Sequence, residues 1–251
     1  MTNKENKFEI TPPIKQLKLF GYEDYFNSFA NFYKKKILPN AILLSGQKGY
    51  GKSTFIYHFV NYLLSMNEEN KYSIEKFTIH QDNKSYKSLL SNSHPNFALI
   101  KNDDLNENIK IEKVRETLVF LSKSTYSSNI KIVLIDNSEL LNTNSANALL
   151  KAIEDNDKNT FFFIIHNNSY KILSTIKSRC IEFKFFFSQV EKKDVLNSLT
   201  SQYKNISELN KLDDIFYFDT PGNIIKYLAI FNNYDINFLK DKLACVLALT
   251  D

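Results

Sequence analysis

Short continuous runs of apolar residues alternate, up to about residue 186, with stretches in which apolar residues recur every three or four positions. The continuous runs predict strands buried on both faces, and the longer spacing predicts amphipathic helices. The predicted strands are 41–45, 97–100, 130–135, 160–165 and 181–183. The predicted helices are 22–36, 53–64, 111–122 and 143–154, the last with Thr143 as its N-cap. This alternation predicts an α/β fold with a parallel sheet covered on both sides.

Two parts of the chain depart from this alternation. Residues 67–93 are polar and irregular, with a weak helical pattern at best. Beyond residue 187 the strand signals stop, and helices are predicted over 190–203, 207–217 and 222–231. The pattern therefore predicts an α/β core over 1–186 and a small helical domain over 187–233.

The composition is that of an ordinary globular protein, with 43% hydrophobic and 24% charged residues among 251. A net charge of +4 permits contact with nucleic acid, but a solvated lysine-rich surface is the better explanation. No apolar run approaches the roughly 18 residues of a membrane span, and the N-terminus lacks a secretory signal. The two cysteines make neither a disulfide framework nor a zinc site by themselves. We therefore expect a cytoplasmic protein that contacts no membrane.

Glycine and arginine are scarce in this chain. There are five glycines, of which Gly46, Gly49 and Gly51 lie in one loop, and arginine occurs only at Arg115 and Arg179. Because the composition favours lysine over arginine, an arginine that does occur is a candidate for a physical role that lysine does not fill.

The loop after the first predicted strand matches the pattern G-x-x-x-x-G-K-[ST] at Gly46, Gly51, Lys52 and Ser53. Glycines let the backbone N–H groups approach phosphate oxygens, and the helix that follows directs its positive end at the same anion. Lys52 would neutralise the β- and γ-phosphates, and the Ser53 hydroxyl would bind Mg²⁺. Thr54, next in the same turn, is also predicted to lie at the nucleotide. The alternative is an ordinary glycine turn.

Asp136 follows the apolar strand 130–135, at the end of the strand where open α/β sheets bind ligands. It is predicted to hold Mg²⁺ together with Ser53, unless it merely ends the strand. Hydrolysis needs a further carboxylate to orient water, but the next residue is Asn137. Glu139 is close in sequence and is expected to face elsewhere. ATP or ADP binding is therefore better supported than turnover.

With these residues placed, the chain resembles the clamp loader subunits of bacterial DNA polymerase III, most closely the delta-prime type, over about residues 18–230. The segment 145–154 is similar to that family's aANALLKxLEEP run, and 178–180 is its SRC motif. The further matching segments are 93–96, 111–115 and 132–142.

The resemblance implies an AAA+ fold, that is, a P-loop core with a five-stranded parallel sheet, a helical lid and a collar domain. It implies a hetero-pentamer with delta and tau/gamma subunits that loads the sliding clamp onto primed DNA. The SRC arginine, here Arg179, would act in trans as an arginine finger in a neighbour's ATP site. Asn167, at the end of the fourth strand, would sense the γ-phosphate, with the adjacent His166 and Asn168 as the alternatives. Residues 234–251 would begin a truncated or reduced collar.

Asn137 and the lid helix depart from the pattern of active ATPases and favour the delta-prime type over the motor subunits. The four-cysteine zinc module that the motor subunits and some delta-prime relatives carry is missing from 65–95, so no zinc is predicted. The lid helix that carries a sensor arginine in active ATPases reads Thr220-Pro221-Gly222-Asn223 here. An active tau/gamma-type ATPase remains an alternative, and a P-loop phosphotransferase is a more distant one, because its acceptor lid would be rich in arginine.

Overall fold

The computed structural model of the chain describes residues 9–102, 107–123, 130–155, 157–201 and 217–233. They fall into two compact units. The larger unit takes the described residues of 13–47 and 52–186. The smaller unit holds the described residues 9–12, 48–51, 187–201 and 217–233. The tip of the glycine loop, Lys48–Gly51, is thus grouped with the C-terminal helices.

The larger unit is built on a five-stranded sheet with the order β2-β3-β4-β1-β5, in which every neighbouring pair is parallel. The strands are β1 (Ala41–Gly46), β2 (Phe97–Ile100), β3 (Lys131–Ile135), β4 (Thr160–Asn167) and β5 (Ile181–Lys184). All residues of β1 and β3 are buried, as expected for strands covered on both faces. The predicted α/β fold with a parallel sheet is confirmed.

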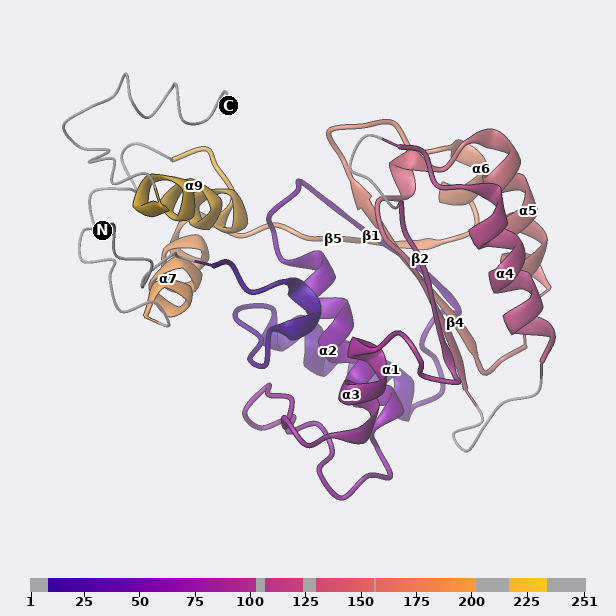
Figure 1. The fold of residues 1–251 in the computed structure, drawn as a ribbon, viewed down its shortest axis with the longest axis horizontal. Helices are drawn as coiled ribbons and strands as arrows, with labels where there is room; N and C mark the ends of the chain where they lie inside the picture. The colour runs from indigo at the N-terminus through magenta and orange to yellow at the C-terminus, as the bar shows by residue number, and fades with distance from the viewer. Residues whose placement is uncertain (1–8, 103–106, 124–129, 156, 202–216, 234–251) are drawn as a thin grey trace, which may run out of the picture. The chain divides into compact units, whose positions relative to one another are not determined.

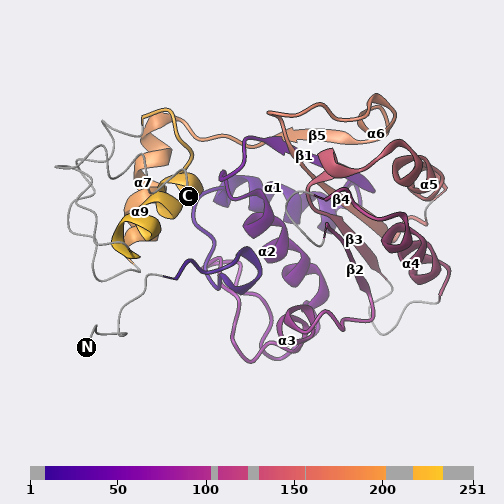
Figure 2. The same cartoon turned by 45° about the horizontal axis from the view of Figure 1, so that its top comes forward.

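Helices cover both faces of this sheet (Figure 1; Figure 2). One face carries α1 (Glu23–Lys34), α2 (Lys52–Leu64) and α3 (Lys84–Leu90). The other carries α4 (Ile111–Ser122), α5 (Thr143–Glu154) and the short α6 (Ser174–Lys177). Two 3-10 turns, η1 (Pro13–Lys15) and η2 (Ser138–Leu140), complete the unit.

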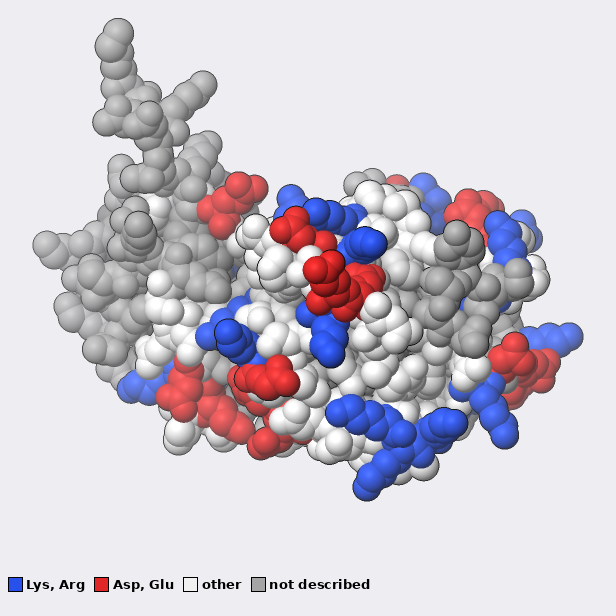
Figure 3. Space-filling view, turned by 90° about the horizontal axis from the view of Figure 1, so that it is seen from below, with Lys and Arg blue, Asp and Glu red and all other residues white. Residues whose placement is uncertain are grey.

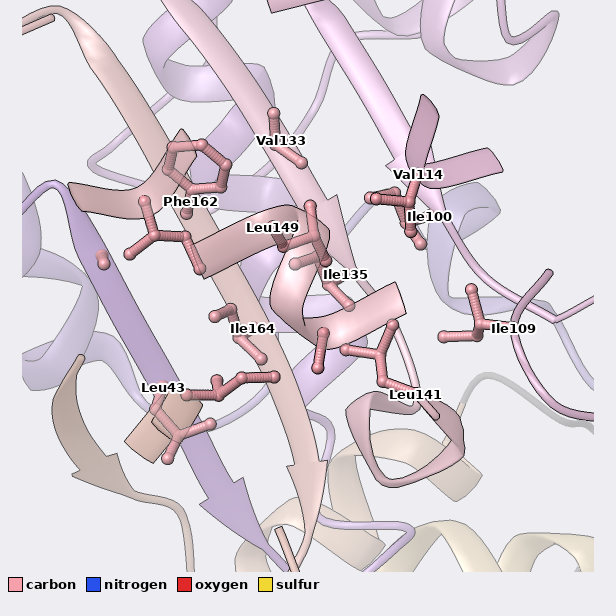
Figure 4. Packing of buried hydrophobic residues seen from close by; sticks show 14 residues of the cluster. Leu43, Ile100, Ile109, Val114, Val133, Ile135, Leu141, Leu149, Phe162 and Ile164 are labelled. Atoms are coloured by element: carbon pink, nitrogen blue, oxygen red, sulfur yellow. The ribbon is translucent and has the colours of Figure 1, made fainter. Parts of the chain in front are cut away.

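The core between the sheet and the α4–α5 layer is aliphatic. Leu43, Val133 and Ile164 project from three strands toward Val114 of α4 and Leu149 of α5 (Figure 4), and all five are fully buried. Burying one such side chain stabilises the fold by about 1.5–3 kcal/mol. The opposite layer is aromatic: Phe26 and Phe29 of α1 pack edge-to-face on Phe55 and Phe59 of α2.

Two local predictions were wrong. The segment 67–93 contains α3, which begins after Asn83, where the Asn83 side chain accepts a hydrogen bond from Tyr86 N–H at 2.6 Å. Asn83 in turn accepts a bond from buried Asn61, so a long-range contact supports a helix too short to show periodicity. The cap of α5 is Asn142, whose side chain accepts from Ser145 N–H at 2.8 Å, and Thr143 is the first helical residue.

The smaller unit contains α7 (Gln189–Thr200) and α9 (Pro221–Asn233), which pack through Leu196, Ile224, Ile225 and Leu228. α7 begins with a capping box in which Ser188 and Glu191 bond each other's backbone N–H groups. Nearly all of the predicted helix 207–217, and all of 234–251, lie outside the described residues. In the described part of the chain no helix is long and apolar enough to cross a membrane.

Candidate functional site

The glycine loop leaves β1 at a point where the backbone has no room for a side chain. A Cβ on Gly46 would lie 2.3 Å from the carbonyl oxygen of Phe185, which immediately follows β5. Gly49 has a φ of +93°, and a Cβ there would lie 2.0 Å from the Thr220 hydroxyl oxygen. Glycine is therefore required at both positions for conformational and steric reasons.

The helix after the loop begins at Lys52, directly at the carboxyl end of β1. The first-turn N–H groups of a helix have no partner within the helix, so they and the positive end of α2 favour an anion. Ser53 and Thr54 are both half-buried in this first turn. The structure thus gives the predicted phosphate-binding residues the strand–loop–helix context that they require.

Lys52 is buried, and its ammonium group contacts the loop itself. Its Nζ donates hydrogen bonds to the carbonyl oxygens of Gly46 at 2.6 Å and Gln47 at 2.7 Å. Burial lowers the pKa of Lys52 to about 8, although the negative charges of Glu139 and Asp136 act in the opposite direction. The lysine is therefore held at the loop by neutral acceptors, with two carboxylates close enough to affect its charge.

Asp136 lies where the sequence predicts, immediately after β3, and it is half-buried. Burial raises its pKa, and the backbone N–H of Asn137, which donates to Asp136 Oδ1 at 3.0 Å, opposes this rise. Ser53 and Asp136 supply one hydroxyl and one carboxylate, the oxygen donors that Mg²⁺ takes beside nucleotide phosphates. Their donor chemistry fits this ion.

Asn137 has no carboxylate and its amide is already engaged. The residue adopts a left-handed backbone conformation with φ 57°. Its Nδ2 donates to the Oδ1 of buried Asn102 at 3.0 Å. An amide in this position orients a neighbour but does not take a proton from water.

Glu139 lies at the carboxyl end of β4, contrary to the expectation that it faces elsewhere. The turn η2 brings its carboxylate to the end of β4, where Oε2 accepts the backbone N–H of Asn167 at 3.1 Å. His166 Nδ1 lies 3.5 Å from the same oxygen. Burial alone would raise the pKa of Glu139, but the interactions with His166 and with the N–H of Asn167 outweigh it and lower the pKa. Sequence spacing contains no signal for this residue, because its direction depends on the left-handed turn at Asn137.

Asn167 ends β4 and is the register partner of Gly46, so it lies beside the start of the loop. Its side chain is half-buried, and its Oδ1 accepts the N–H of Ser169 at 3.2 Å. The structure thus brings Gly46, Lys52, Asp136 and Asn167 to the carboxyl ends of β1, β3 and β4.

Arg179 is located elsewhere, at the turn after α6. Its Nε donates to Glu154 Oε1 at 2.5 Å, and its Nη1 donates to Thr175 O at 3.0 Å and to Ser178 Oγ at 3.4 Å. The residue is exposed. Among the described residues its hydrogen bonds go to α5, α6 and the adjoining turn, and none goes to the glycine loop.

The tip of the glycine loop is bonded to the start of α9 within the smaller unit. Gly222 N–H donates to Gly49 O at 2.9 Å, and Thr220 Oγ1 donates to Lys48 O at 2.8 Å. A Cβ on Gly222 would lie 2.8 Å from Gly49 Cα, so both chain segments need glycine at this crossing. The backbone of Gly222 thus contacts the loop tip in the same segment, 220–223, in which the resemblance to active ATPases predicts an arginine.

Comparison with known proteins places this geometry in a family. The family model described as DNA polymerase III, delta subunit matches residues 21–188. DNA polymerase III subunit delta' of Buchnera aphidicola subsp. Schizaphis graminum is 30% identical over 190 residues, covering 74% of this chain and 55% of the relative. The Pseudomonas aeruginosa delta' subunit is 28% identical over 143 residues, 57% of this chain and 42% of its own length. A Buchnera gamma subunit is 29% identical over 182 residues, 72% of this chain and 47% of its length.

Solved structures agree on the fold. Domain III of the Thermotoga maritima replication initiation protein DnaA matches with a TM-score of 0.53 at 14% identity, over 97% of this chain and 98% of that one. The T. maritima RuvB Holliday junction branch migration motor matches with a TM-score of 0.53 at 14% identity, over 95% of this chain and 73% of that one. These are AAA+ proteins, and at this identity the likeness concerns the fold alone.

The chain spans about half the length of the curated delta' relatives that it matches. The family model nevertheless covers well over half of the chain itself. The chain therefore belongs to the AAA+ clamp loader family of DNA polymerase III, as a subunit of the delta-prime type.

Proposed function

We propose that this chain works as the delta-prime-type member of a clamp loader, binding nucleotide without turning it over efficiently. Its partners would be delta and tau/gamma subunits in a hetero-pentamer that places a sliding clamp on primed DNA. The cofactor would be ATP or ADP with Mg²⁺, and no zinc. As a replication protein of this type it would act in the cytoplasm.

The observation that carries the proposal is the contrast between a complete phosphate loop and the residue after Asp136. Lys52 and Ser53 lie in the first turn of α2, after the glycine loop. At the position where a water-orienting carboxylate is needed, Asn137 donates its amide to Asn102. A site of this kind binds phosphate but lacks the group that activates water.

Each site residue has a proposed role. The backbone of Gly46, Gly49 and Gly51 would wrap the phosphates, and Lys52 would neutralise them. Ser53 and Asp136 would hold Mg²⁺. The remaining nucleotide contacts would come from Thr54 and Asn167. Magnesium supplies charge neutralisation at the phosphates when it is bound.

Arg179 would act outside this site, as an arginine finger in the ATP site of a neighbouring subunit. An exposed guanidinium is always charged and matches phosphate oxygens geometrically. Arg179 lies before the amino end of β5, whereas Gly46 lies at the carboxyl end of the parallel strand β1, and this separation suits action in trans. The three-part division into a core (1–186), a lid (187–233) and the beginning of a collar (234–251) belongs to the same proposal.

A direct contribution to DNA binding is not needed for this role. The face in Figure 3 carries interspersed acidic and basic side chains, with one group of Lys and Arg side chains at its lower edge. Nonspecific DNA binding depends on several Lys and Arg side chains that neutralise neighbouring phosphates. We propose that the DNA contact belongs to the assembled complex.

The second candidate is an active tau/gamma-type ATPase, and Glu139 favours it. Its carboxylate lies at the carboxyl end of β4, and its negative charge raises the pKa of Lys52 against the effect of burial. Its oxygen, however, already accepts the N–H of Asn167. Single-turnover hydrolysis of ATP by the isolated chain separates the two candidates, because a rate well above background would favour the motor subunit.

The main test is reconstitution with delta and tau/gamma subunits, followed by measurement of clamp loading onto primed DNA. The proposal predicts loading that depends on this chain, and loss of stimulated ATP hydrolysis with Arg179→Ala. Loading that proceeds equally well without this chain would contradict it.

A further inference from the structure

Arg179 does not project freely from the surface, because intrachain hydrogen bonds engage two of the three guanidinium nitrogens. Nε donates to Glu154 Oε1 at the last residue of α5. Nη1 donates to the carbonyl of Thr175 and the hydroxyl of Ser178 in α6 and its C-cap. Among the described residues, Nη2 makes no hydrogen bond. A fork fixed on one side therefore keeps two N–H groups for another acceptor.

The ion pair of Arg179 with Glu154 is exposed enough for the guanidinium to reach an acceptor on another subunit. The Arg179 side chain is 32% exposed and that of Glu154 is 48% exposed. An arginine in solution samples many rotamers and loses this freedom when it binds a phosphate. Because Glu154 and the end of α6 hold the guanidinium before any partner arrives, part of that loss has already occurred on folding.

We propose that Glu154 is a positioning residue for Arg179, holding the guanidinium in the orientation in which Nη2 meets phosphate oxygens of the neighbouring subunit's nucleotide. This inference rests on the proposed arginine-finger function. It adds that the end of α5 and the turn after α6 together fix the orientation of the guanidinium. Glu154 itself contacts neither the nucleotide nor the reacting atoms.

The alternative effect of the same ion pair is to hold the arginine back. A carboxylate competes with phosphate for the guanidinium, and breaking the pair would then release a more active finger. The bonding pattern argues for positioning, since Glu154 engages Nε and the N–H groups of Nη2 do not have to leave it before they bind another acceptor. The two effects differ in sign when Glu154 is removed.

The experiment measures ATP hydrolysis by the fully reconstituted loader with Glu154→Ala, Glu154→Gln, Arg179→Ala and the double variant. We expect Glu154→Ala to lower kcat about two- to fivefold, the range for an exposed ion pair, with KM for ATP unchanged. Glu154→Gln should restore most of the rate, because its amide oxygen still accepts from Nε. The double variant should be no slower than Arg179→Ala.

Asp82→Ala is the matched control. Asp82 forms an exposed ion pair with Lys87 at 2.8 Å, so its loss changes the charge equally at another place on the same unit. We expect wild-type kcat for this variant. Complex formation by each variant is checked by size-exclusion chromatography before the rates are compared.

The outcomes separate this inference from the proposed function. If Arg179→Ala leaves the rate unchanged, the arginine-finger function itself is wrong. If Arg179→Ala slows hydrolysis but Glu154→Ala matches wild type, or is faster, positioning by Glu154 is wrong. An equal loss in Asp82→Ala, or a Glu154→Ala effect confined to KM, would likewise overturn it.

Discussion

The hydroxyl of Thr220 donates a hydrogen bond to the carbonyl of Lys48 at 2.8 Å, although 172 residues separate them in the sequence. Two residues further on, Gly222 N–H bonds Gly49 O, so the start of α9 and the residue before it hold the tip of the glycine loop by one backbone and one side-chain hydrogen bond. The loop tip therefore has partners that do not depend on bound nucleotide.

Substitution at this crossing should destabilise the loop tip. Gly222→Ala places a Cβ 2.8 Å from Gly49 Cα, a backbone atom that cannot move aside cheaply. We expect a loss of about 1–3 kcal/mol in unfolding free energy by urea titration. Thr220→Val, which removes the hydroxyl and keeps the shape, should cost about 0.5–1.5 kcal/mol. Unchanged stability in Gly222→Ala would show that the two backbones do not approach so closely in solution.

Nucleotide binding should depend on pH through Lys52. Because burial lowers the pKa of Lys52 to about 8, the free protein loses the ammonium charge as pH rises through that value. Phosphate binding favours the charged form, so affinity should fall by about tenfold between pH 7 and pH 9. Equilibrium titration with a fluorescent ATP analogue measures this. In Lys52→Arg, whose side chain stays charged, the dependence in this window should disappear, and its persistence would assign the titration to another group.

Removing the ammonium group of Lys52 should weaken nucleotide binding and leave the fold intact. We expect Lys52→Ala to bind ATP at least about tenfold more weakly, since its charge is lost from the phosphate site. Of the two residues whose carbonyls it contacts, Gln47 is exposed to solvent. Far-ultraviolet circular dichroism should remain that of wild type. Unaltered ATP affinity in a folded variant would mean that the loop does not bind phosphate.

Glu139 should stabilise the end of β4 in a pH-dependent way. Its folded-state pKa lies below the ordinary 4.5, so its ionised form contributes stability at pH values above 4.5. That contribution is lost as pH falls below 4.5 through the folded-state pKa. Glu139→Ala leaves the N–H of Asn167 without this acceptor, at an expected cost of about 1–3 kcal/mol at pH 7.

The measurement is chemical unfolding of wild type and Glu139→Ala across pH 3–7. The stability difference should be largest at neutral pH and should shrink on acidification. Glu139→Gln, which keeps an oxygen acceptor for Asn167, should show a smaller loss than Glu139→Ala. A difference that stays constant across this range would indicate that the Glu139 charge contributes nothing.

The sequence by itself determined the strands of the sheet and the strand–loop–helix context of the glycine loop. Continuous apolar runs at 41–45 and 160–165 identify buried parallel strands, because only a strand covered on both faces lacks polar positions. The loop from Gly46 to Ser53 is equally local, since its chemistry needs adjacent backbone groups and one helix terminus. The position of Asp136 was also evident from the sequence, because this residue directly follows the apolar run of β3.

Only the tertiary structure decided what the remaining polar side chains contact. Glu139 reaches Asn167 because a left-handed residue at Asn137 redirects the chain, and periodicity carries no record of such a turn. Glu154 meets Arg179, and Thr220 meets Lys48, across long separations in the chain. Hydrogen bonds are short-ranged and directional, so these pairings arise from how the elements pack and not from residue spacing.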